Sequence, residues 1–96
     1  MKICNDETKD ITADYFYHGC NDNGLRIYHE QGYLAINYFG EDGLWITPII
    51  EHAKNHGNHV FKIDGLYLDA RNLDVDHDDD GIFHKGGIPF HNTEKL

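Results

Sequence analysis

Ten glycines divide this chain of 96 residues into short segments, and only two prolines accompany them. Glycine favours turns because it adopts backbone angles that other residues avoid. The sequence contains no internal repeat and no linker-like stretch. We therefore expect many short elements around one core, and a chain of this length holds a single domain, residues 1–96.

The composition indicates a folded, acidic protein. Apolar residues make up 40% of the chain and aromatic residues 12%, more than a disordered acidic chain carries. The net charge of -9 argues against direct nucleic-acid binding, which usually needs a basic patch. The first ten residues are too polar for a signal peptide, and no apolar run approaches the ~20 residues of a membrane span. We therefore expect a cytoplasmic protein with no membrane segment, in which Cys4 and Cys20 are free thiols.

The first half of the chain alternates strand and helix signals. Residues 15–18 are rich in aromatic side chains and predict a short strand, which Gly19 would end. The polar residues 21–24 predict a turn. Residues 25–31 fit two helical turns ended by a glycine, although their β-branched and aromatic members also allow a strand.

Further strand signals follow at several places. Residues 33–39 have high strand propensity, and a glycine-containing loop leads back into a strand at 44–46. An Asp-Gly pair at 64–65 lies between alternating apolar residues, which predicts a hairpin. Two short strands near 82–83 and 88–91 would complete the domain.

One segment has the sequence of a helix with a defined start. Thr47 and Pro48 fit an N-cap and a first helical residue, and Gly57 fits the stop, so we predict a helix over 48–56. Together these signals predict a small α+β fold of mostly antiparallel strands with one or two short helices.

The most acidic segment offers a candidate calcium site. Asp76, Asp78 and Asp80 alternate before Gly81, as in the first half of a calcium-binding loop. Gly87 stands at the twelfth position, where such a loop has a glutamate that binds the ion through two oxygens. The sequence therefore leaves two interpretations, a weak calcium site and a solvated acidic loop, and it favours the loop.

A histidine pair lies in the predicted helix. His52 and His56 are four residues apart, so they share a helix face and could both reach one zinc ion. In the usual metalloprotease motif a glutamate follows the first histidine, whereas here Glu51 precedes it. An exposed polar face of the helix is therefore the favoured interpretation.

Several short motifs follow one another in the chain. They are 16–20 (FYHGC), 43–48 (GLWITP), 51–57 (EHAKNHG), 59–63 (HVFKI), 80–82 (DGI) and 88–96 (IPFHNTEKL). Their order resembles the ADP-ribosyltransferase family, in the branch of diphtheria-type toxins and poly(ADP-ribose) polymerases. That branch has a strand with Tyr-His-Gly, a Gly-aliphatic-aromatic-aliphatic-Thr strand, and then a helix with an internal alanine. The resemblance covers most of residues 15–96.

The resemblance implies a split β-sheet that binds NAD in the cleft between its two halves. His18 would hold the ribose of the adenosine half, and the backbone of Gly19 would pair with the nicotinamide amide. Trp45 would stack on the nicotinamide ring, and Thr47 would also belong to the cofactor site. His18 and Trp45 would support displacement of nicotinamide through an oxocarbenium-like state, with transfer of ADP-ribose to a protein or nucleic-acid acceptor.

Two departures separate this chain from the family pattern. The family usually has tyrosine where this chain has Trp45, which can still stack but changes the hydrogen bonding. The catalytic glutamate expected at the start of the last strand, near residues 86–87, is missing, and the polar side chains nearby are Lys85, His84 and His91. The sequence therefore leaves open whether the domain is an active mono-ADP-ribosyltransferase.

A different class of function also fits the charge. A small acidic protein can cover the basic groove of a partner and block it, as inhibitors that phages direct against host defence do. Five aspartates between residues 74 and 80 supply -5 of the net charge of -9, so the acidity is concentrated in one loop. This clustering weakens the hypothesis of a non-enzymatic inhibitor with a basic protein partner.

Overall fold

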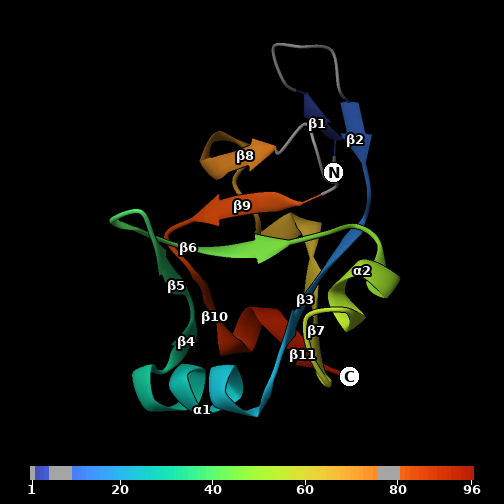
Figure 1. Cartoon of the computed structure of the whole chain (residues 1–96). Helices are drawn as coiled ribbons and strands as arrows, with labels where there is room; N and C mark the ends of the chain where they lie inside the picture. The colour runs from blue at the N-terminus through green and yellow to red at the C-terminus, as the bar shows by residue number, and fades with distance from the viewer. Residues whose placement is uncertain (1, 5–9, 76–80) are drawn as a thin grey trace.

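Two main antiparallel β-sheets, two smaller strand pairs and two short helices form the described part of the domain (Figure 1). The structure is a computed structural model that describes residues 2–4, 10–75 and 81–96, with the side chains of 2–4, 10–12, 70 and 75 left undescribed. The observed architecture confirms the predicted α+β class with mostly antiparallel strands. Neither helix in the described ranges is long and apolar enough to cross a membrane.

The first of the two main sheets has three strands. They are arranged in the order β11 (Thr93–Lys95), β7 (His59–Asp64) and β3 (Tyr15–Cys20). Strand β3 pairs with β7 along its whole length, from Tyr15 opposite Asp64 to Cys20 opposite His59. The predicted strand over 15–18 was therefore too short, because Gly19 continues the ladder rather than ending it.

The second main sheet has four strands. They are arranged in the order β5 (Ile36–Tyr38), β6 (Glu41–Ile46), β9 (Ile82–Lys85) and β8 (Leu73–Val75). A tight turn joins β5 to β6, with Phe39 and Gly40 both at positive φ, 51° and 84°. The predicted strand over 33–39 is in fact two short strands, since β4 and β5 belong to different sheets.

Smaller elements complete the chain. Two further strand pairs are antiparallel, and three 3-10 helices connect longer elements. The pairs are β1 (Lys2–Cys4) with β2 (Asp10–Thr12) and β4 (Tyr33–Leu34) with β10 (Ile88–Pro89); the 3-10 helices are η1 (Gly65–Tyr67), η2 (Ala70–Asn72) and η3 (Phe90–Asn92).

The hairpin predicted at 64–65 was wrong. The carboxylate of Asp64 accepts a hydrogen bond from the N–H of Leu66 at 2.9 Å, which starts η1 instead of a two-residue turn. The partners of β7 are β3 and β11, both distant in sequence. A local Asp-Gly signal was therefore overridden by long-range strand pairing.

Helix α1 (Asp22–Gln31) begins earlier than predicted. The side chain of Asn21 accepts a hydrogen bond from the N–H of Gly24 at 2.8 Å, which caps the first turn. The polar residues 21–24, interpreted as a turn, therefore form the start of the helix. Gly32 ends it as predicted, in the left-handed conformation with φ 88°.

Helix α2 (Ile50–Lys54) is shorter than the predicted 48–56. The hydroxyl of Thr47 accepts a hydrogen bond from the N–H of Ile49 at 3.1 Å, but the N-cap of the helix is Ile49 itself, two residues after Thr47. This local turn delays the helix until Ile50. The helix nevertheless occupies the predicted part of the chain, beside β3 (Figure 1).

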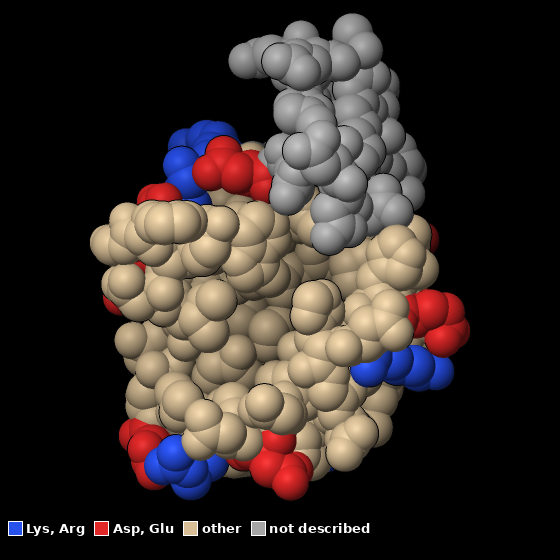
Figure 2. Space-filling view, viewed as in Figure 1, with Lys and Arg blue, Asp and Glu red and all other residues tan. Residues whose placement is uncertain are grey.

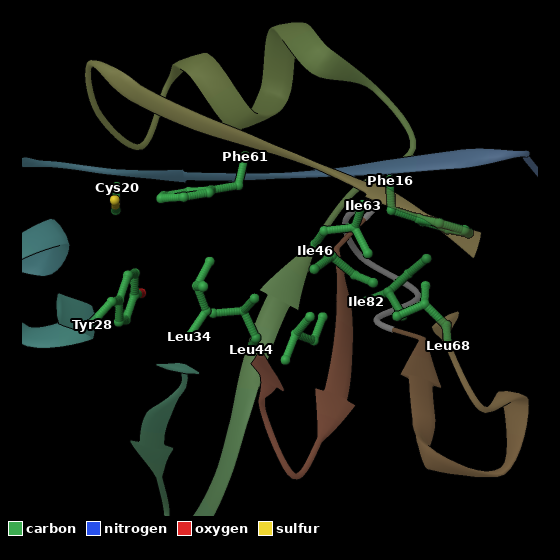
Figure 3. Packing of buried hydrophobic residues seen from close by; sticks show 11 residues of the cluster. Phe16, Cys20, Tyr28, Leu34, Leu44, Ile46, Phe61, Ile63, Leu68 and Ile82 are labelled. Atoms are coloured by element: carbon green, nitrogen blue, oxygen red, sulfur yellow. The ribbon is translucent and has the colours of Figure 1, made fainter. Parts of the chain in front are cut away.

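The core fills the space between the two main sheets (Figure 3). Aliphatic and aromatic side chains from β3 and β7 face side chains from β6 and β9. The fully buried ones from these four strands are Phe16, Ile63, Leu44, Ile46 and Ile82. Burial of these large side chains stabilises the arrangement of the sheets, because each contributes about 1.5–3 kcal/mol.

Among the described residues, one backbone bridge joins the edges of the two main sheets. The N–H of Tyr17 donates to the carbonyl of Thr47 at 2.7 Å, and the N–H of Thr47 donates back to Tyr17 at 2.9 Å. Tyr17 belongs to β3, and Thr47 directly follows β6. The backbones of the two sheets thus meet at this bridge and separate on either side of it.

We predict that Gly19→Ala strongly destabilises the protein. A Cβ atom at this position would overlap the backbone carbonyl of Ala53, which belongs to α2. Because that backbone cannot move without displacing α2 from β3, we expect a loss of more than about 2 kcal/mol in the free energy of unfolding, measured with urea.

Gly81→Ala is the matched control. The nearest atom to its Cβ would be Trp45 Cε3 at 3.4 Å, an ordinary contact, so the change should stay within about 1 kcal/mol. Equal stability of the two variants would contradict the close packing of Gly19 on α2.

Candidate functional site

A pocket of about 470 Å³ lies beside the bridge where the two sheets separate. Its walls come from the end of β3, from α1, from the end of β6 and from α2. Figure 2 shows this face of the molecule hollowed near its centre. The pocket is therefore formed by segments that are far apart in the sequence.

All four residues that the sequence predicted for a cofactor site line this pocket. They are His18, Gly19, Trp45 and Thr47. His18 and Gly19 lie near the end of β3, whereas Trp45 lies on β6. The bridge between Tyr17 and Thr47 brings these two segments together.

The described wall of the pocket carries no Asp, Glu, Lys or Arg, although the whole protein has a net charge of -9. Figure 2 shows the acidic and basic side chains at the periphery of this face, outside the hollow. The ionisable groups of the wall are histidine, cysteine and tyrosine side chains. A ligand here meets a locally uncharged surface at neutral pH wherever these groups are neutral.

His18 is buried and uses both of its ring nitrogens. Its Nδ1–H donates to the carbonyl oxygen of Trp45 at 2.6 Å, because a carbonyl can only accept. Nε2 therefore carries the lone pair, and it accepts a hydrogen bond from the hydroxyl of Tyr28 at 2.9 Å. Burial lowers the pKa of His18 to about 4, so the imidazole is neutral at pH 7.

Tyr28 is a site residue that the sequence analysis missed. It lies on α1 with only 3% of its surface exposed, and burial raises the pKa of its hydroxyl to about 12. The hydroxyl thus remains protonated and donates to His18 at any ordinary pH. A tyrosine on the buried face of a helix needs a partner for its hydroxyl, and that need was the available signal.

Gly19 offers backbone groups to the pocket. The N–H and C=O of Tyr17 point away from β7, since both pair with Thr47. Backbone groups alternate in direction along a strand, so the N–H and C=O of Gly19 point to the same side. No other described strand pairs with β3 on that edge, and Gly19 lines the pocket.

Trp45 forms an aromatic wall of the pocket. Its ring meets Tyr38 edge-on, with centroids 5.5 Å apart, and lies 5.2 Å from the ring of Phe83. These contacts hold the half-buried indole in place. Gly81 lies against the indole ring, because a Cβ atom at this position would be 3.4 Å from Trp45 Cε3. Since glycine has no side chain, this part of the ring stays uncovered.

Thr47 has a structural part in the site. Its backbone forms the bridge to Tyr17, and its hydroxyl starts the turn that leads into α2. The residue is 7% exposed, so little of it faces a ligand. Its presence in the pocket wall follows from its position at the junction of the sheets.

The structure adds little to the proposed metal site. Asp76, Asp78 and Asp80 lie outside the described residues. Within the described ranges, no group of three or more His, Cys, Asp or Glu side chains could hold a metal ion. His52 and His56, considered above for zinc, both line the pocket instead.

Cys20 is a buried free thiol in the pocket wall, in agreement with the predicted absence of a disulfide at this residue. Burial raises the pKa of this thiol above its usual value. It is therefore protonated at neutral pH and forms a weakly polar part of the wall.

Comparison of the chain with protein-family models, curated protein sequences and solved structures finds no match.

We predict that the protein loses stability as the pH falls from about 6.5 to about 4. The unfolded chain binds a proton at His18 in this range, whereas the folded protein does not, because burial keeps the folded-state pKa near 4. The decrease in the free energy of unfolding that His18 causes is absent above pH 6.5 and reaches about 3 kcal/mol near pH 4. Urea unfolding across this pH range measures it.

His18→Gln should flatten this part of the pH profile, because glutamine does not titrate. His91→Gln changes an exposed histidine outside the pocket and should leave the slope unchanged. A slope that is the same in both variants would show that His18 is not responsible.

Proposed function

We propose that the pocket binds NAD or a related ADP-ribosyl ligand. The observation that carries this proposal is the juxtaposition of Gly19 and Trp45: an open backbone N–H and C=O beside an aromatic wall. The size of the pocket, about 470 Å³, lies within the range of small-molecule sites.

The nicotinamide group matches the first part of this site. Its carboxamide has an N–H donor and a C=O acceptor, so it can pair with both backbone groups of Gly19 as another strand would. Its flat ring can stack on the indole of Trp45, which its neighbours hold in place. The two interactions together define both the position and the plane of the ring.

The sugar hydroxyls of the ligand match the pair formed by His18 and Tyr28. Tyr28 donates its one hydroxyl proton to His18, so its oxygen is left as an acceptor. A ribose hydroxyl could donate to this oxygen, or take the place of Tyr28 at His18 Nε2. Both routes need a ligand that donates a hydrogen bond, which a ribose does.

The proposal concerns binding, with transfer of ADP-ribose as a further step. In this family the transfer uses a carboxylate that orients the ribose and the acceptor. None of the described residues that line the pocket is acidic. A binding experiment is therefore the direct test of the site.

We expect millimolar NAD, ADP-ribose or nicotinamide to raise the melting temperature. A ligand that binds only the folded state stabilises it by about 2.7 kcal/mol at a concentration one hundred times its dissociation constant. Differential scanning fluorimetry at pH 7.5 measures the shift. If all three compounds leave the melting temperature unchanged, the proposed function is wrong.

Trp45→Leu should weaken binding of nicotinamide and NAD at least severalfold, because it removes the stacking surface. Tyr67→Leu is the matched control, since Tyr67 is an exposed aromatic residue that does not line the pocket. Isothermal titration calorimetry compares the two variants. Equal affinities would contradict stacking on Trp45.

A further inference from the structure

We propose that His52 and His56 make the pocket select the charge of its ligand, so that a cationic ring is bound at neutral pH and rejected in acid. This inference rests on the proposed function, because it concerns the ring that would lie against Gly19. From the sequence, the same two histidines were expected to be zinc ligands or part of an exposed polar helix face.

The first observation is the position of the two histidines. Both line the pocket, one on α2 and one just after it, four residues apart. Ala53 lies between them in the sequence, and its carbonyl is in close contact with the backbone of Gly19. A ring paired to Gly19 is therefore a neighbour of this histidine pair.

The second observation is that the three buried ionisable groups of the wall keep one charge state. The pKa of His18 is about 4, the pKa of Tyr28 is about 12, and burial raises the pKa of Cys20. All three are neutral between pH 5.5 and 8. His52 and His56 are the remaining histidines of the described wall, and histidine is the side-chain type whose charge ordinarily changes in this range.

Charged groups on the surrounding elements also bear on the pair. Glu51 and Lys54 of α2 form an ion pair with each other at 3.7 Å, and both side chains are more than half exposed. Farther around the pocket, Asp22 of α1 pairs with His59 of β7. The other titratable groups that line the pocket are Tyr17, His18 and Cys20 of β3 and Tyr28 of α1. The charge of His56 acts on His18, and the charges of Asp22 and Lys95 act on Cys20.

The chemistry follows from the charge of the ligand ring. Histidine gains a positive charge as the pH falls through the range from 8 to 5. The nicotinamide ring of NAD carries a fixed positive charge, so protonated imidazoles beside it repel it. A neutral ring of the same shape experiences no such repulsion. Acid should therefore weaken binding of the cationic ring selectively.

The test compares NAD with benzamide adenine dinucleotide, in which a neutral benzamide ring replaces the nicotinamide. Calorimetry gives the dissociation constant of each ligand at pH 8 and at pH 5.5. We expect the dissociation constant of NAD, divided by that of benzamide adenine dinucleotide, to rise about tenfold between pH 8 and pH 5.5. A rise of this size corresponds to one like charge a few ångströms from the ring in a partly buried site. Both ligands share the diphosphate, so other effects of acid cancel in the ratio.

Two variants assign the effect. His52→Gln combined with His56→Gln should make the ratio independent of pH, and His56→Gln alone should reduce the change if the double variant fails to fold. His91→Gln is the matched control, because His91 is exposed and does not line the pocket. It should keep the full change.

Three results would overturn the inference. A ratio that is equal at the two pH values, or a change that persists in both pocket variants, would overturn it while leaving the proposed function intact. If neither dinucleotide binds at either pH, the proposed function fails and this inference fails with it.

Discussion

The hydrogen bond from His18 Nδ1 to the carbonyl of Trp45 connects the parts of the molecule that form the pocket. It lies next to the backbone bridge between Tyr17 and Thr47, and together they fix the edge of one sheet against the edge of the other. Because a carbonyl only accepts, this bond also determines which ring nitrogen carries the proton. The remaining nitrogen then holds Tyr28, so that α1 is tied to the same point. One neutral imidazole thus links two sheets and a helix.

Close backbone packing is the second constraint, and it serves the fold and the site together. Gly19 allows α2 to approach β3 so closely that a single methyl group would overlap a carbonyl. The same lack of a side chain leaves the backbone of Gly19 open to the pocket, on the edge of β3 away from β7. Since His52 lies on α2 and His56 just after it, this close approach also brings two imidazoles beside the backbone edge. The packing of one glycine therefore determines which side chains surround a ligand.

Much of the architecture could be predicted from the sequence, and the failures have physical causes. The helix ended by Gly32 was one of two alternatives for its segment, and the strand character of β3, β6 and β7 was recognised because it depends on local propensity. The hairpin at Asp64 and Gly65 was wrong, since the pairing of β7 depends on strands far away in the chain. The motifs brought four of the pocket residues together, but no local pattern indicated that Tyr28 would reach His18. Such a contact is set by how a helix packs on a sheet.

The central claim is that the open backbone of Gly19 and the ring of Trp45 bind the amide and the ring of nicotinamide. The most direct measurement is a two-dimensional NMR spectrum of the ¹⁵N-labelled protein during titration with nicotinamide. We predict that the largest changes occur at the backbone amide of Gly19 and at the indole signal of Trp45, because one gains a hydrogen bond and the other a stacked ring. Unchanged signals from both residues at saturating nicotinamide, or changes confined to residues 65–67 of η1, which do not line the pocket, would contradict the account.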